Sequence, residues 1–297
     1  MSFWAVLRFL TILPAPASEN AITGGHTRLA APATEQHTEH TSTDMKTVLI
    51  LPAGSAGDEA MQLTGRSTLY FPLVGLVIGL LLALLYIIFR TLLPSTVTGV
   101  LLVAALTIIT GAHHIDGLMD SCDALVAGKT RGQRLEIMAD MRVGAFGITA
   151  ACLLLLTKYV CLSASLNLSA LLTFPLLSRW AITGLILLFP AAKESGSFFA
   201  LKSGANWRGF IGATVIALAA AVLLNGLNIG PLMMAGLFIL LYCLGLLFRR
   251  IFGGLTGDCC GALIEAGEVI VLILIMASMR LLPYISGYNL FKIPFPF

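Results

Sequence analysis

Three aspartates, Asp116, Asp120 and Asp123, follow one another at spacings of four and three residues in a chain that is otherwise apolar. Because an α-helix turns by about 100° per residue, their side chains fall within roughly 60° of one another on one helical face. Carboxylates without a counter-charge are costly in or beside a lipid bilayer. Clustered carboxylate oxygens suit a divalent cation such as Mg²⁺, Mn²⁺ or Ca²⁺. The spacing therefore predicts a metal site, although the dipole of a helix N-terminus would by itself explain Asp116.

A second acidic stripe follows the glycine-rich segment that ends at Gly257. It consists of Asp258, Glu265 and Glu268, which are again spaced to share a helical face. Glycines before a helix start can present backbone N–H groups to a phosphate. Two acidic stripes that face each other would form a shared metal and phosphate pocket. We therefore expect Asp258 among the metal ligands, and Asp123 either as a further ligand or as a substrate contact.

Other polar residues lie close to these stripes along the chain. His113 and His114 directly precede the first stripe, and His114 is a candidate general acid or base, with a capping or packing histidine as the alternative. Glu136 and Asp140 share a face of a short predicted helix, and Arg142 follows it. They are either substrate contacts, with Arg142 as a phosphate clamp, or the solvated charges of an interfacial helix.

Cations elsewhere could bind phosphate groups. Arg179 lies inside a predicted membrane span, where an arginine usually faces a cavity or a partner. Arg66 precedes the first long span, and Lys193 lies in a loop where it could also simply mark the cytoplasmic side. The residues that we expect to contact substrate or phosphate are Arg66, Glu136, Asp140, Arg142, Arg179, Lys193, Gly257, Glu265 and Glu268.

The elements that must position these residues are membrane-spanning helices. Of the 297 residues, 58% are hydrophobic and 11% are charged, whereas a soluble domain carries about 25% charged residues. The long apolar stretches lack the alternation of a membrane β-barrel. We therefore predict an all-α polytopic membrane protein, a helical bundle of about seven transmembrane helices plus a short N-terminal interfacial or re-entrant segment. The net charge of +3 does not indicate nucleic-acid binding. The expected spans are 71–92, 96–112, 146–166, 169–190, 210–228, 231–248 and 262–283.

The polar segments between the spans predict the organisation and orientation of the chain. We expect an interfacial or re-entrant segment at 1–13, a polar cytoplasmic loop at 14–65, a transmembrane catalytic bundle at 66–283 and a C-terminal tail at 284–297. Most of the 18 basic residues then lie on the side of the N-terminus, which indicates the cytoplasmic side. The acids gather near the same side, which favours an enzyme over an ion-coupled transporter with charges at the midplane.

Several segments together resemble one known family. RSTLYFPLVGLVIG, HIDGLMDSCDAL, RLEIMADMRVGAFG, SRW and GGLTGDCCGALIEAGE occur in this order, with FLTILPAP near the start. They are similar to cobalamin synthase, the adenosylcobinamide-GDP ribazoletransferase family. The resemblance covers about residues 66–270. It implies that adenosylcobinamide-GDP is joined to α-ribazole or its 5′-phosphate, giving adenosylcobalamin or its 5′-phosphate and releasing GMP. It also implies a Mg²⁺ requirement and a multi-pass protein of the bacterial inner membrane.

The chain departs from the family pattern at three places without losing a carboxylate. His113 precedes His114 where the family usually has Phe or Leu, Ala124 replaces a usual glycine, and Ile12 replaces a common arginine. The loop at 14–65 is longer than expected. A CDP-alcohol-phosphotransferase-like lipid enzyme is a rival interpretation, but no Ala-Arg pair follows Asp116-Gly117 at the required offset.

The resemblance and the residues together suggest a mechanism. Asp116 and Asp120 would hold Mg²⁺ against the diphosphate, and Asp123 or Asp258 would complete the metal site. Asp120 or Glu268 could accept the ribose hydroxyl proton. We expect the catalytic residues to be Asp116, Asp120 and His114. A homo-oligomer, or an association with other enzymes that act on corrinoids, stays open.

Overall fold

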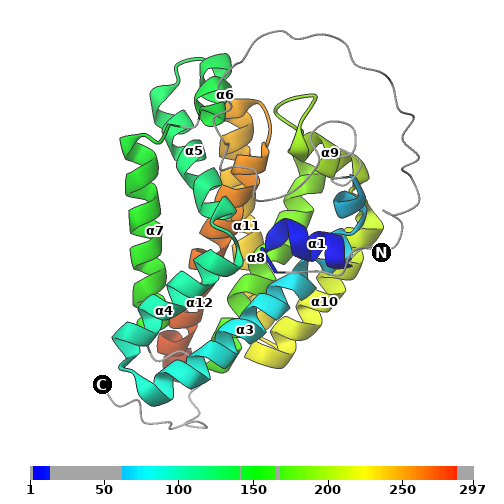
Figure 1. The fold of residues 1–297 in the computed structure, drawn as a ribbon. Helices are drawn as coiled ribbons and strands as arrows, with labels where there is room; N and C mark the ends of the chain where they lie inside the picture. The colour runs from blue at the N-terminus through cyan, green and yellow to red at the C-terminus, as the bar shows by residue number, and fades with distance from the viewer. Residues whose placement is uncertain (1–2, 14–61, 141, 165–166, 286–297) are drawn as a thin grey trace, which may run out of the picture.

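The structure, a computed structural model, describes residues 3–13, 62–140, 142–164 and 167–285 (Figure 1). The predicted loop at 14–65 and the predicted tail at 284–297 lie almost entirely outside these residues. After a short helix at 62–66, the described chain is a bundle of helices. Its named elements are α1 (Phe3–Leu10), the 3-10 helix η3 (Thr68–Tyr70), α3 (Phe71–Leu92), α4 (Ser95–Ile109), α5 (His113–Ala127), α6 (Arg131–Ala139), α7 (Ala145–Ser163), α8 (Leu168–Leu188), α9 (Ser197–Gly204), α10 (Trp207–Asn225), α11 (Ile229–Phe252) and α12 (Gly257–Ile285).

Six of the described helices are long and apolar enough to cross a membrane, namely α3, α7, α8, α10, α11 and α12. A seventh crossing is formed if α4 and α5 count together, although they are bent by 89° at their junction. The chain is thus a multi-pass membrane protein with six or seven spans among its described residues, which confirms the predicted fold class.

The predicted second span at 96–112 needs a correction. Its helix, α4, has 15 residues, fewer than the ~20 needed to cross the hydrocarbon core. The helix stops because Gly111 and Ala112 have φ values of +64° and +59°, in the left-handed region. Two successive left-handed residues cannot continue a right-handed helix. The first acidic motif therefore lies on the second arm of a broken helix, α5, which rises from the end of α4 toward α6 in Figure 1.

Helix α8 lies at the centre of the bundle, with nearly every residue from Ala170 to Ile186 buried. Helix α3 packs closely against it because two glycines face it. A Cβ atom at Gly75 would lie 2.7 Å from the backbone of Leu176, and one at Gly79 would lie 2.8 Å from the backbone of Leu171. Small residues at helix contacts are the usual means of bringing membrane helices together.

The N-terminal helix α1 has eight residues and is therefore about 12 Å long, too short to cross a bilayer. Val6, Leu7 and Leu10 are buried against the bundle. The backbone N–H of Ile12 donates to Ile109 O at 2.9 Å, which fixes the following segment at the α4–α5 bend. Placement of residues 1–13 at the membrane interface stays a prediction.

Candidate functional site

The two predicted acidic stripes meet at the beginnings of α5 and α12. A Cβ atom at Gly117 would lie 2.7 Å from the carbonyl oxygen of Asp258, and one at Gly261 would lie 3.1 Å from the Cα atom of His114. Glycine at both positions lets the two helices approach this closely, and at Gly117 a Cβ atom would clash with the facing backbone. The contact places the first turn of α5, with Asp116, beside the first turn of α12, with Asp258.

Beside this contact lies a pocket of about 230 Å³, which we call the apolar pocket. His113, His114, Asp116 and Asp258 belong to its lining, so the structure brings together these predicted residues. His114 is 7% exposed, and its Nδ1 atom has no hydrogen-bond partner among the described residues. The large apolar side chains of the lining come from α1, α3, α8, α9 and α12: Phe9, Phe71, Ile182, Ile186, Phe198, Leu201 and Ile264.

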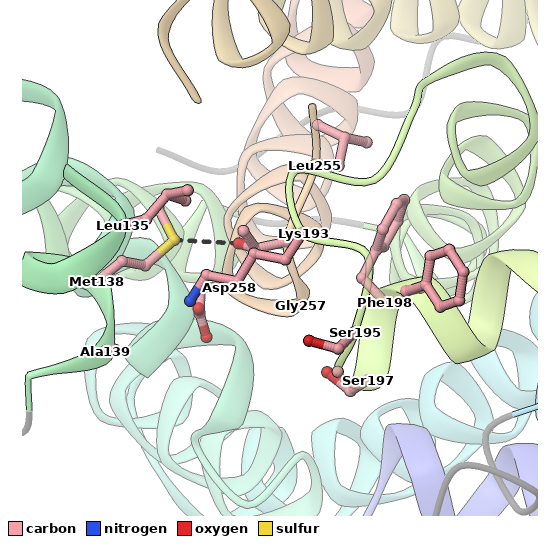
Figure 2. A pocket seen from close by; sticks show the side chains of 13 residues that line it. Leu135, Met138, Ala139, Lys193, Ser195, Ser197, Phe198, Leu255, Gly257 and Asp258 are labelled. Carbon is pink, nitrogen blue, oxygen red and sulfur yellow. Dashed lines mark hydrogen bonds between the residues drawn. The ribbon is translucent and has the colours of Figure 1, made fainter. Parts of the chain in front are cut away.

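A second pocket of about 160 Å³, which we call the loop pocket, shares part of its lining with the first. In Figure 2, Lys193 and Asp258 lie on one side of its opening, and Ser195 and Ser197 lie on the other. The wall shared by the two pockets consists of Ser197, Phe198, Gly257 and Asp258. A ligand spanning both pockets would therefore pass Asp258.

The loop that carries Lys193 is fixed to the turn before α12. Ala191 and Leu255 form an isolated parallel bridge, in which Ala192 N donates to Leu255 O and Leu255 N donates to Pro190 O, both at 2.9 Å. From α6, Arg131 Nη2 donates to Ala192 O at 2.6 Å. These bonds hold the loop and the start of α12 as one unit.

Three helices begin at these pockets: α5 at His113, α9 at Ser197 and α12 at Gly257. The first N–H groups of a helix lack partners within the helix and carry a partial positive charge. Thr256 Oγ1 accepts from Cys259 N at 3.1 Å at the start of α12, and its own hydrogen bond to Met138 Sδ is drawn in Figure 2. Helix starts of this kind favour phosphate groups.

Asp123 has a different setting from Asp116. Its carboxylate accepts hydrogen bonds from Gly144 N at 2.7 Å and Gly147 N at 2.8 Å, and so caps the first turn of α7. Asp120 is 7% exposed and belongs to the lining of neither pocket. Throughout the described ranges, no three His, Cys, Asp or Glu side chains are grouped so that they could hold a metal ion. The metal-binding roles of Asp116, Asp120, Asp123 and Asp258 stay predictions, and the contacts of Asp123 indicate a structural role.

The other acids of the second stripe and Arg179 form a buried cluster inside the spans, which we call the charge cluster. Lys158 Nζ of α7 donates to Glu265 Oε2 at 2.6 Å and to Glu268 Oε2 at 2.5 Å. Arg179 Nη1 of α8 donates to Glu268 Oε1 and, at 3.0 Å, to Ser178 Oγ. All four charged side chains are at most 2% exposed. Buried charges at membrane depth are tolerated when they pair with one another.

The charge cluster corrects the expectation that Glu265 and Glu268 face the same pocket as Asp258. Glu268 is the twelfth residue of α12 and lies about 16 Å along the axis from its start. It is thus three turns into the span and outside the lining of both pockets. Lys158 was not among the predicted site residues. Its signal in the sequence is a single lysine within an apolar span, which requires an acidic partner.

The remaining predicted residues lie away from the shared wall. Glu136 and Asp140 line a separate hollow on α6. Arg142 is exposed and pairs with Asp140 through Nη2 and Oδ2 at 2.7 Å. The hydrogen bonds that Arg142 donates to this carboxylate, and then the charge of the carboxylate, raise the pKa of Arg142. Arg66 is exposed at the end of the 62–66 helix and lines neither pocket. Of the predicted phosphate contacts, the pockets contain Lys193 and Gly257. Ser195 and Ser197 were missed, although their Ser-Gly-Ser sequence before a helix is a signal for an anion site.

Comparisons with known proteins give one consistent result. Residues 41–276 match the family model described as "Cobalamin-5-phosphate synthase". The adenosylcobinamide-GDP ribazoletransferase of Roseiflexus sp. (strain RS-1) is 36% identical over 242 residues, covering 80% of this chain and 90% of the relative. Its counterparts in Desulfitobacterium hafniense (strain Y51) and Geotalea daltonii are each 38% identical, covering 70% and 72% of this chain and 85% and 87% of the relatives. No solved structure matches the chain.

Proposed function

Since the chain belongs to the cobalamin-5-phosphate synthase family and is a membrane-embedded transferase of cobalamin biosynthesis, we propose that it joins adenosylcobinamide-GDP to α-ribazole or its 5′-phosphate and releases GMP. The products are adenosylcobalamin or its 5′-phosphate. The family assigns the class of reaction, and the two pockets suggest where its steps take place.

The observation that carries this proposal is the wall shared by the loop pocket and the apolar pocket. On the loop side, Lys193, Ser195 and the starts of α9 and α12 offer a cation, hydroxyl groups and backbone N–H groups to a diphosphate. On the other side lie Asp116 and His114, which are groups able to accept a proton. An anionic donor and a hydroxyl acceptor can therefore meet at Asp258.

The reaction needs one proton acceptor and a place for negative charge. The ribose oxygen forms a bond to the phosphorus next to the corrinoid, and the P–O bond to GMP breaks with its electron pair on the GMP phosphate. The proton of the attacking hydroxyl passes to a base on the shared side of the apolar pocket. We assign this role to Asp116 or to Nδ1 of His114, because both groups line that pocket. Lys193 and the helix starts stabilise the leaving phosphate.

The carboxylates that line the apolar pocket are candidate ligands for a magnesium ion. Mg²⁺ in phosphate-transferring sites is commonly held by one or two carboxylates together with substrate phosphates. Asp258 and, where His114 is the base, Asp116 provide carboxylates on one pocket, so a third protein ligand is not required. When bound there, the ion would supply neutralisation of the charge that develops on the GMP phosphate.

We also propose that the pockets open toward the cytoplasm of a bacterial inner membrane. Helices α6 and α9 and the connections 189–196 and 253–256 lie at one end of the bundle (Figure 1), and the segments at this end include Lys193, Arg131 and Arg142. An excess of basic residues in short loops marks the cytoplasmic side. A cysteine introduced at Lys193 should react with an impermeant thiol reagent in inverted vesicles and not in intact cells.

The direct test is GMP release by the purified protein in lipid nanodiscs. With adenosylcobinamide-GDP, α-ribazole and Mg²⁺, we expect release of GMP that EDTA abolishes and added Mg²⁺ restores. Asp116→Asn should lower turnover by about 10²–10⁴-fold, the size of a lost acid–base contribution. Glu194→Gln, which removes an exposed carboxylate outside both pockets, is the control and should keep its activity. Normal turnover by a correctly inserted Asp116→Asn variant would remove Asp116 from the mechanism.

A further inference from the structure

We propose that the apolar pocket is the binding site for the base of the acceptor ribonucleoside, and that Ile182, Ile186 and Leu201 make this site selective for an apolar aromatic base. The inference rests on the proposed function and adds a location for one of its two substrates. Neither the family match nor the names of the relatives assign this site.

The lining of the apolar pocket favours one of the available ligand groups. Phenylalanine rings and aliphatic side chains surround most of it, and its charged and imidazole groups come from the starts of α5 and α12. The base of α-ribazole is dimethylbenzimidazole, which has no N–H donor once it is joined to ribose. Guanine carries N–H groups and a carbonyl, and leaving these unpaired in an apolar site is costly. The corrinoid ring is much larger than a pocket of about 230 Å³.

The position of the pocket matches the chemistry of the acceptor. Ile182 and Ile186 of α8 and Leu201 of α9 line the same pocket as the polar groups of His114, Asp116 and Asp258. A base held by the three apolar side chains therefore has its ribose within the pocket that also contains these polar groups. The ribose hydroxyl would then lie between a proton acceptor and the loop pocket. Holding two reactants in this geometry is a large part of catalysis by proximity.

The loop pocket has the complementary chemistry for the donor. Lys193 and Ser195 line it but do not line the apolar pocket. Their charge and hydroxyl groups suit the diphosphate of adenosylcobinamide-GDP. The two substrates should therefore respond to different substitutions. Changes in the apolar pocket should affect the acceptor, and changes at Lys193 should affect the donor.

The test measures KM for each substrate in three variants. Ile186→Ala enlarges the apolar pocket, and Ile211→Ala makes the same change at a side chain of α10 that is 60% exposed. Ile186→Ala should raise KM for α-ribazole about tenfold or more, as expected for lost methylene contacts in a specificity pocket, with less than a twofold change for the donor. Ile211→Ala should change neither value. Lys193→Ala should raise KM for the donor alone.

A second measurement distinguishes contact with the base from a general structural effect. The acceptor is replaced by the α-ribonucleoside of benzimidazole, which lacks the two methyl groups. The wild-type protein should prefer α-ribazole over this analogue by about tenfold or more. The preference should shrink in Ile186→Ala, because the variant no longer contacts the methyl groups. Leu201→Ala, on a different helix, repeats the test should Ile186→Ala fail to fold.

The outcomes separate this inference from the proposed function. A rise in donor KM in Ile186→Ala, with acceptor KM unchanged, would overturn the inference and assign the pocket to guanine or to part of the corrinoid. Unchanged values for both substrates in Ile186→Ala and Leu201→Ala would also overturn it. A wild-type protein that releases no GMP from the authentic substrates would refute the proposed function itself.

Discussion

Replacing Lys158 by methionine is the most direct perturbation of the charge cluster. The four side chains carry two positive and two negative charges, so the cluster is neutral as a whole. Lys158 Nζ lies 2.6 Å from Glu265 Oε2 and 2.5 Å from Glu268 Oε2. Glu268 also accepts from Arg179, whereas Lys158 is the ion-pair partner that the described residues give Glu265. The substitution therefore leaves one negative charge buried without compensation.

The expected loss of stability is large. Removing one partner of a buried ion pair costs about 3–5 kcal/mol, mostly because the other charge remains buried. The double variant Lys158→Met/Glu265→Gln removes one charge of each sign and leaves the pair between Arg179 and Glu268. Its loss of stability should be smaller than the summed losses of Lys158→Met and Glu265→Gln by about 0.5–3 kcal/mol, the usual range of coupling between contacting residues.

The assay is unfolding in a mild detergent, followed by size-exclusion chromatography after heating or by denaturant titration. Lys129→Met provides the matched control, because it makes the same substitution at an exposed lysine and should change stability by less than about 0.5 kcal/mol. A Lys158→Met variant as stable as the wild type would refute the reasoning. A double variant that loses the sum of both single losses would refute the pairing with Glu265.

Two further predictions concern the settings of single side chains. Asp123→Ala should lower the free energy of unfolding by about 0.5–2 kcal/mol, because it removes the cap of α7. Asp123→Asn keeps a hydrogen-bond acceptor and should lower the free energy of unfolding by less. An Asp123→Asn variant that is folded but inactive would support a metal-binding role for Asp123 instead. Arg131→Met removes the hydrogen bond to Ala192 and so loosens the loop that carries Lys193. The variant should therefore have a higher KM for adenosylcobinamide-GDP in the GMP-release assay. A change confined to the KM of the acceptor would contradict this prediction.

The number and type of the helices could be predicted from hydropathy because apolar runs of sufficient length have few other stable arrangements in a bilayer. The break between α4 and α5 could not. The segment 96–112 is uncharged throughout, and a single glycine near its end is common in membrane helices. The bend depends on a left-handed conformation at Ala112, which an alanine adopts only when tertiary contacts enforce it.

Helical periodicity predicted which face the three aspartates share, and it could not predict what each would contact. Asp123 lies seven residues after Asp116, which is about 10 Å farther along the helix axis. Over this distance the same face passes from the apolar pocket, which Asp116 lines, to the start of α7, which Asp123 caps. Shared register is thus evidence for a common direction of side chains. Convergence on one ion requires the neighbouring helices to be placed as well.

Helix α12 connects the charge cluster to the shared wall. Its first turn carries Gly257 and Asp258, and about two and three turns later Glu265 and Glu268 pair with α7 and α8. These ion pairs fix α12 against two other spans, so they also limit how far Asp258 can move relative to the apolar pocket. An ion-coupled transporter would need its buried charges to become accessible from each side in turn. Here the four charges contact one another and line neither pocket, which favours a role in positioning the reaction site over a role in transport.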